Sequence, residues 1–179
     1  GSFAMRILIL GAAAGGGFPQ WNCNCAACRR ARLGDPSAPK ALQASIAVSA
    51  DSRHWYVINA SPDLRQQIAE NPALHPKGGA LRDTPIAGVI LTNGDVDALC
   101  GLLNLREGMR FGIYAHPRVM RVLDENSIFR VLDAELVARV PLDLDAPQTL
   151  TLPDGKASGL EIVPFAVPGK IALYLERAE

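Results

Sequence analysis

The chain alternates short apolar runs with segments of glycine and polar residues. Five runs near the start and middle are apolar enough to predict buried β-strands, namely residues 5–10, 45–49, 55–59, 87–91 and 111–115. Three further short runs predict strands toward the end, at residues 149–152, 160–165 and 171–175. The strands at 45–49 and 55–59 are separated by a turn at Asp51 and Ser52, which predicts an antiparallel pair.

The segments between these runs have the signals of helices. A short basic helix is expected around residues 29–32, with its arginines on a solvated face, and it ends before a glycine. Ser61 is expected to cap a second helix that has Pro62 at its first position. Further helical stretches are expected at 99–105 and within 116–139. Strands and helices in alternation predict an α/β fold.

The composition predicts one folded domain and narrows the classes of partner. The 179 residues are 49% hydrophobic and 20% charged, which is enough for a packed core. Lys plus Arg and Asp plus Glu both number 18, so there is no excess of basic residues for binding nucleic acid. No run reaches the roughly 18 apolar residues of a membrane span. Residues 1–4 resemble the remnant of an expression tag, which places the domain at 5–179.

Three of the four cysteines lie within six residues, as Cys23, Cys25 and Cys28. Thiolates at this spacing can meet on one tetrahedral zinc, with bonds of about 2.3 Å, whereas such close neighbours cannot all form disulfides with one another. Buried free thiols are the alternative. A water, a residue outside this chain or one of four side chains could be the fourth ligand: His54, His75, Cys100 or His116. Such a cluster favours a reducing compartment, so we expect a cytoplasmic protein.

Two carboxylates, Asp95 and Asp97, follow the apolar run at 87–91. Loops after the strands of α/β sheets commonly bind ligands, and alternate residues can face one cation. A helix over 98–105 that is capped by Asp97 explains the same residues without a metal. The residues alone leave both interpretations open.

The glycine-rich segment at 11–17 (GAAAGGG) follows the first predicted strand. Its spacing does not match G-x-G-x-x-G, and no Lys-Ser or Lys-Thr pair follows it. We therefore expect a tight loop that passes close to other backbone, since glycine has no Cβ to prevent such an approach.

At these motifs the sequence resembles the PqqB family of pyrroloquinoline quinone (PQQ) biosynthesis, within the metallo-β-lactamase-like superfamily. The matching strings span nearly the whole chain: GAAAGGGFPQWNCNCAAC (11–28), SIAVS (45–49), NASPDLRQQI (59–68), LRDTPI (81–86), LTNGDVDALCGLLNLREG (91–108) and VPGK (167–170). The string GGGFPQWNCNC is long and specific.

The resemblance implies a four-layer αββα fold with metal loops at one edge of the sheets. It implies a structural zinc on Cys23, Cys25 and Cys28, a site that a C-terminal His completes in related phosphodiesterases. It also implies an iron-dependent oxygenase that hydroxylates the tyrosine of a Glu-Tyr unit excised from a precursor peptide, with Asp95 and Asp97 as catalytic residues and iron ligands. A carrier of PQQ or its precursor to the periplasm, or a catalytically dead, zinc-stabilised partner, is the alternative. The implied partners are that precursor or PQQ and other proteins of the pathway, and a homodimer is left open.

The sequence departs from the family pattern in two ways. The superfamily motif H-x-H-x-D-H corresponds here to Asn93, Asp95, Asp97 and Ala98. The PqqB family itself lacks the first two histidines but normally keeps the last one, and the methyl group of Ala98 cannot bind a metal. The chain also covers mainly the N-terminal half of the fold, so the later His and Asp ligands are absent from it. Enzyme and carrier therefore both remain open.

Overall fold

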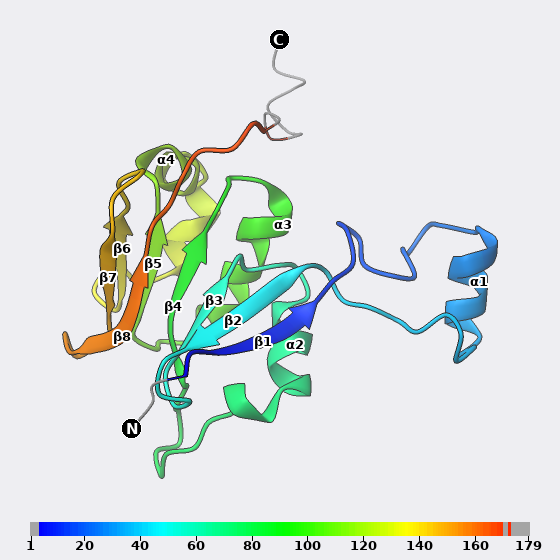
Figure 1. Ribbon diagram of the computed structural model, residues 1–179, viewed down its shortest axis with the longest axis horizontal. Helices are drawn as coiled ribbons and strands as arrows, with labels where there is room; N and C mark the ends of the chain where they lie inside the picture. The colour runs from blue at the N-terminus through cyan, green and yellow to red at the C-terminus, as the bar shows by residue number, and fades with distance from the viewer. Residues whose placement is uncertain (1–3, 170–171, 173–179) are drawn as a thin grey trace.

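The computed structural model describes residues 4–169 and 172, and a six-stranded sheet is its centre (Figure 1). The strands lie in chain order: β1 (Arg6–Gly11), β2 (Ser45–Ser49), β3 (Trp55–Ile58), β4 (Ile86–Leu91), β5 (Phe111–Ala115) and β6 (Val137–Pro141). The pairs β1–β2 and β2–β3 are antiparallel, and the three later pairs are parallel. The predicted strand at 171–175 lies outside the described residues, apart from position 172.

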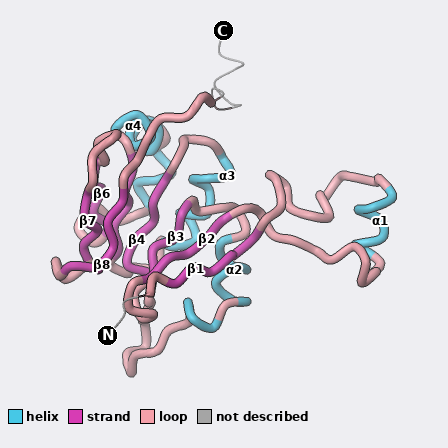
Figure 2. The backbone as a smooth tube through the Cα atoms, in the orientation of Figure 1, coloured by secondary structure: helices cyan, strands magenta, loops and turns pink. Residues whose placement is uncertain are grey.

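Helices cover one face of this sheet (Figure 2). They are α2 (Leu64–Glu70), α3 (Val96–Leu99) and α4 (Pro117–Glu125), with the 3-10 helices η1 (Pro72–Leu74), η2 (Cys100–Leu105) and η3 (Ser127–Val131). The larger hydrophobic core lies between them and the sheet and includes Trp55, Leu64, Val89, Leu102, Ile113 and Leu123. No helix in the described part of the chain is long and apolar enough to cross a membrane.

A two-stranded antiparallel sheet, β7 (Gln148–Thr151) and β8 (Ala157–Ile162), packs on the opposite face. The hydroxyls of Tyr56 and Tyr114 both donate to the carbonyl oxygen of Thr151, at 2.6 and 3.0 Å. A Cβ on Gly112 would lie 2.7 Å from the Tyr114 ring, so the absence of a side chain there makes room for that ring. The described residues thus form three of the four expected layers: helices, a large sheet and part of a second sheet.

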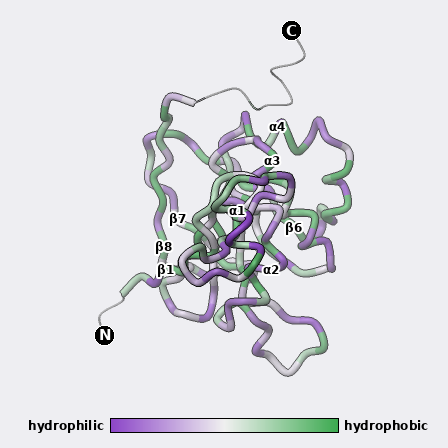
Figure 3. The backbone as a smooth tube through the Cα atoms, turned by 90° about the vertical axis from the view of Figure 1, so that its right-hand side faces the viewer, coloured by the Kyte–Doolittle hydropathy of each residue, from purple (hydrophilic) through white to green (hydrophobic). Residues whose placement is uncertain are grey.

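An arm, defined as residues 12–44, projects from the sheet between β1 and β2 and carries α1 (Ala26–Arg32) (Figure 1). Figure 3 views the molecule from the side of this arm, so that α1 lies in front of the body. The arm leaves and rejoins the sheet at one place, because Gly11 pairs with Ser45. A Cβ on Gly11 would lie 2.2 Å from the carbonyl oxygen of Gln43. The predicted close approach of the glycine segment to other backbone is confirmed here.

Two sequence predictions about the elements are wrong. Residues 137–141 form β6, although helix was expected within 116–139, because pairing with β5 determines the conformation of this short and largely exposed segment. Ser61 does not cap α2, which begins at Leu64, after Pro62. The Ser61 hydroxyl instead donates to Oε1 of the fully buried Gln67 at 3.0 Å, since a buried amide needs a partner.

Candidate metal centre

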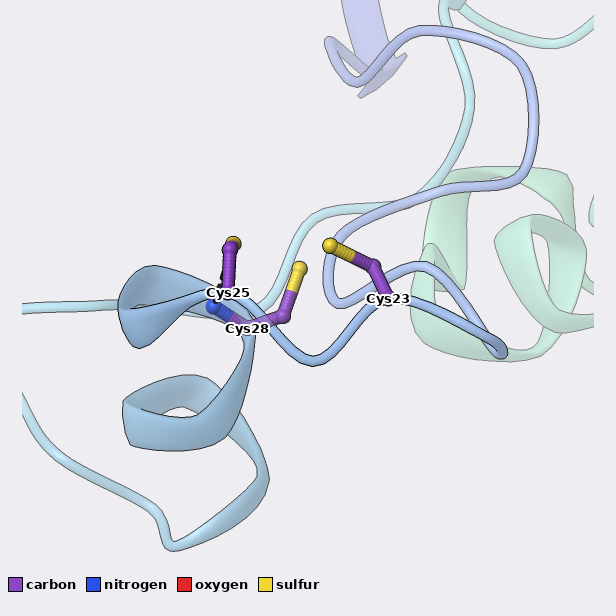
Figure 4. Close-up of side chains that lie close together, drawn as sticks. All are labelled: Cys23, Cys25 and Cys28. Atoms are coloured by element: carbon purple, nitrogen blue, oxygen red, sulfur yellow. Dashed lines mark hydrogen bonds between the residues drawn. The ribbon is translucent and has the colours of Figure 1, made fainter.

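The three clustered cysteines point toward one another at the base of α1 (Figure 4). Their sulfur atoms all lie within 4.8 Å of one another, and the four cysteines of the chain are free thiols. Tetrahedral zinc bound to thiolates at about 2.3 Å requires sulfurs about 3.8 Å apart, so modest side-chain movements would suffice. The donor set and its geometry therefore fit zinc.

The start of α1 sets the chemistry of this cluster. Cys25 is the N-cap of the helix, and its sulfur accepts a hydrogen bond from the Cys28 backbone N–H at 3.4 Å. This bond and those from the neighbouring thiols lower the pKa of Cys25 to about 7. A hydrogen bond from the Gln20 backbone favours the thiolate of Cys28. Burial and the two other sulfurs outweigh this bond and raise the Cys28 pKa. Cys25 is thus the first of the two to become a thiolate ligand as pH rises.

The four candidate side chains for a fourth ligand lie outside this cluster, and three of them bond elsewhere. His54 Nδ1 lies 2.6 Å from Asp51, and His75 Nε2 lies 3.0 Å from the Ala69 carbonyl oxygen. His116 caps α4 by accepting from the Arg118 backbone N–H. Water and a residue outside the described part of the chain remain as candidates.

The loop with Asp95 and Asp97 joins β4 to α3. Asp95, not Asp97, is the N-cap of α3, and its Oδ1 accepts from the Val96 backbone N–H at 2.8 Å. The predicted cap at Asp97 is therefore wrong, because the helix begins two residues earlier than expected. The regular α-helix ends at Leu99, and η2 continues it to residue 105.

Residues at and just after the end of β3 hold the loop between β4 and α3 in place through hydrogen bonds. Asn59, at a φ of 63°, accepts from the Thr92 backbone N–H at 2.9 Å, and its amide donates to the Thr92 hydroxyl at 2.8 Å. The backbone of Ala60 bonds to Ala98 and Gly101, at 2.8 and 2.9 Å. No pattern in the sequence indicates a partner for Asn59, although its position at the end of a predicted strand, beside another strand end, is an available clue.

Asp97 lies against the base of the arm. A Cβ on Gly15 would be 2.4 Å from its Oδ2, so the glycine segment touches this carboxylate directly. Burial, followed by the charge of Asp95, raises the Asp97 pKa. The Asp97 carboxylate has no hydrogen bond or ion pair among the described residues, which leaves its oxygens available to a ligand.

Asp95 and Asp97 do not form a complete iron site with other described residues. The cluster of cysteines is the one group in the described residues with three or more converging metal-binding side chains. A non-haem oxygenase iron typically has two histidines and one carboxylate, whereas Asn93 and Ala98 stand at positions where the resemblance implies histidines. Ala98 is also 1% exposed within α3. The described residues therefore provide two carboxylates and no histidine for such a site.

The arginines of α1 differ from the sequence prediction in part. All three are exposed, as expected, but Arg30 binds Asp35 and Arg32 binds backbone carbonyls of the segment before Cys25. Arg32 lies four residues after Cys28, which is the spacing of neighbours on one helix face. This spacing was the available sign of a connection between Arg32 and the cysteines.

Residues 54–177 match the profile of the beta-lactamase superfamily domain. The chain belongs to this superfamily. Among the curated members that it resembles is coenzyme PQQ synthesis protein B of Gluconacetobacter diazotrophicus, with 63% identity over 170 residues. That alignment covers 95% of this chain and 55% of the relative. The protein of the same name from Rhodopseudomonas palustris strain TIE-1 is 60% identical over 172 residues, again with 55% of its length covered. The chain thus spans about half the length of these relatives, and the expected resemblance to the PqqB family is confirmed.

Solved structures of the superfamily confirm the fold. The crystal structure of Zn2+-bound PqqB from Methylobacterium extorquens superposes with a TM-score of 0.88 at 45% identity, over 96% of this chain and 55% of that one. A new diphosphatase from the PhnP family superposes with a TM-score of 0.61 at 23% identity, over 82% of this chain and 54% of that one. The first similarity adds that a relative binds zinc, and the second supports the shared fold alone.

Proposed function

We propose that this chain serves the synthesis of PQQ and belongs to a protein that hydroxylates the tyrosine of a Glu-Tyr unit excised from a precursor peptide. The observation that carries the proposal is the 63% identity, over 95% of the chain, to a protein named coenzyme PQQ synthesis protein B. Because the chain spans about half of that relative, the hydroxylation is a proposal for the longer protein.

In this proposal Cys23, Cys25 and Cys28 hold a zinc ion that performs no chemistry. The converging sulfurs and the lowered Cys25 pKa support it, as does the zinc in the related crystal structure. The ion would connect the segment at 20–23 to the start of α1 and so hold this part of the arm in one conformation. Through Gly15 the base of the arm contacts Asp97, so the ordered arm forms one wall beside the two carboxylates.

Asp95 and Asp97 are proposed to contribute ligands to an active-site iron, which would supply the redox chemistry with dioxygen. Asn59 and Thr92 hold the start of their loop, and the N-cap bond of Asp95 fixes one of its oxygens. Burial, followed by the charge of Asp95, raises the Asp97 pKa, and a cation bound between the two carboxylates would favour their charged forms.

A second candidate is a carrier of PQQ or its precursor, or a catalytically dead partner of the other pathway proteins. It is favoured by Ala98, whose buried methyl group stands where the superfamily motif has a metal-binding histidine. Such a protein needs a binding surface and a stable arm but no redox metal.

The test is elemental mass spectrometry on the longest form of the protein, purified without oxygen, followed by oxygen-dependent turnover of a Glu-Tyr peptide. We expect one zinc together with iron, and hydroxylated tyrosine in the product. One zinc without iron, combined with tight PQQ binding and no oxygen uptake, would replace the hydroxylase proposal by the carrier. A Cys23→Ser variant provides the control that assigns the zinc to the cysteine cluster.

A further inference from the structure

Arg32, in the last turn of α1, is bonded to the backbone of the segment at 20–23. Its Nη1 donates to the carbonyl oxygen of Cys23 at 2.6 Å. Its Nη2 donates to the carbonyl oxygen of Gln20 at 2.5 Å and lies 3.4 Å from that of Trp21. The planar guanidinium, with five N–H donors in a fixed fork, is suited to binding several carbonyl oxygens at once.

These bonds connect the two pieces of chain that carry the cysteines. Cys23 lies on the segment at 20–23, whereas Cys28 lies inside α1 and Cys25 caps it. Two bonds hold the backbone of Cys23 in place. Its own N–H donates to the Gln20 carbonyl oxygen at 3.1 Å, and its carbonyl oxygen accepts from Arg32. Arg32 therefore fixes the position of Cys23 relative to the helix before any metal binds.

The other arginines of the helix do not share this arrangement. Arg30 binds Asp35 at 2.7 Å and the Ser37 hydroxyl, which belong to the loop after the helix. The side chain of Arg29 makes no hydrogen bond or ion pair with any residue in the described part of the chain. Arg29 and Arg32 thus differ in the contact to segment 20–23 while sharing residue type, helix and exposure, which makes Arg29 a matched control.

We propose that Arg32 is a positioning residue of the cysteine metal site, which holds Cys23 beside Cys25 and Cys28. The inference rests on the proposed zinc site and adds the residue that preorganises it. Without Arg32, zinc binding must also order the segment at 20–23, and this cost appears as weaker binding. Replacing a residue that orients metal ligands without binding the metal itself typically lowers metal affinity by about 10- to 100-fold.

The test compares zinc dissociation constants of Arg32→Met, Arg32→Lys and Arg29→Met with the parent protein, by competition with a chromophoric chelator. We expect Arg32→Met to weaken binding by about 10- to 100-fold. Arg32→Lys should weaken it less, because one ammonium group retains a bond to the segment but cannot span all three carbonyls, and Arg29→Met should leave it unchanged. The cobalt-substituted forms report on the ligand set, and their thiolate charge-transfer band should persist in every variant.

Equal zinc affinity of Arg32→Met and the parent protein would overturn the role of Arg32 and leave the zinc site intact. A parent protein that binds no zinc at the cysteines would overturn the zinc site, and the inference with it. If circular dichroism shows that Arg32→Met does not fold, the zinc affinity of Arg32→Lys is compared with that of the parent protein instead. A loss of affinity with an unchanged thermal unfolding midpoint of the zinc-free protein would exclude a general structural role and support the inference.

Discussion

At the scale of single residues, Asp51 organises the turn between β2 and β3. Its Oδ1 accepts from the backbone N–H groups of Arg53 and His54, both at 2.8 Å, and its Oδ2 lies 2.6 Å from His54 Nδ1. Burial favours the neutral carboxyl, but the hydrogen bonds to His54 and Arg53 outweigh it and lower the Asp51 pKa. The charged form of Asp51 therefore stabilises the folded chain.

This pKa predicts a loss of stability in acid. A carboxyl whose pKa is lower in the folded state contributes stability above its unfolded pKa, about 3.9, and loses that contribution as pH falls further. We expect the difference in urea midpoint between the parent chain and Asp51→Asn to shrink between about pH 5 and about pH 2.5. Asp145→Asn, at another exposed turn with positive φ, is the control. A difference in urea midpoint that stays constant across this pH range would show that the charge of Asp51 does not contribute to stability.

At the scale of elements, η2 packs directly on the backbone after β3. A Cβ on Gly101 would lie 2.1 Å from the carbonyl oxygen of Ser61, which is backbone and cannot turn aside. We expect Gly101→Ala to lower the free energy of unfolding by about 1–3 kcal/mol or more, as overpacked sites do. Gly79→Ala is the control, because nothing lies within 4 Å of a Cβ there. Equal urea midpoints for the two variants would contradict this packing.

The arm provides a second prediction at this scale. If zinc holds the cysteines together, a strong chelator should raise backbone amide exchange in residues 11–35 and leave β4 and β5 protected, since these strands lie in the core of the sheet. Hydrogen-exchange mass spectrometry of protein with and without chelator measures both regions at once. Exchange that stays the same in residues 11–35 would contradict a structural zinc on Cys23, Cys25 and Cys28.

The sequence predicts elements best where burial dominates. The runs at 45–49 and 111–115 match β2 and β5, because both strands are almost fully buried. It fails at β6, where the partner strand rather than the local pattern determines the structure. The clustering of the three cysteines also followed from their spacing. Three other features could not be predicted from the sequence, because each depends on how separate segments or helix ends are placed. They are the bonds of Arg32, the cap by Asp95 and the contact of Gly15 with Asp97.

At the scale of the whole molecule, the described part leaves apolar surface uncovered. Ile7 and Ile9 of β1 are 54% and 74% exposed, on the side of the sheet that β7 and β8 cover elsewhere. The relatives are nearly twice as long as this chain, so experiments on the proposed iron site belong in the longest form of the protein.

In that form, Ala98→His should raise the iron content, because it restores a nitrogen ligand beside Asp97. Ala98 is buried, so the variant should also lose stability through overpacking. Ala98→Phe is the control, since it adds similar bulk without a ligand. Iron stoichiometry that is unchanged by Ala98→His, measured by elemental mass spectrometry, would contradict a ligand role for position 98.

The pairing of Gly11 with Ser45 makes the arm an insertion between two paired strands. The two strands that flank it already lie side by side, so a short hairpin turn could replace residues 12–44 without changing the register of the sheet. Evolution can therefore lengthen, shorten or exchange this module while the two flanking strands stay paired. For the same reason the arm, with its cysteines and Arg32, could be transferred by protein engineering onto another antiparallel pair of strands.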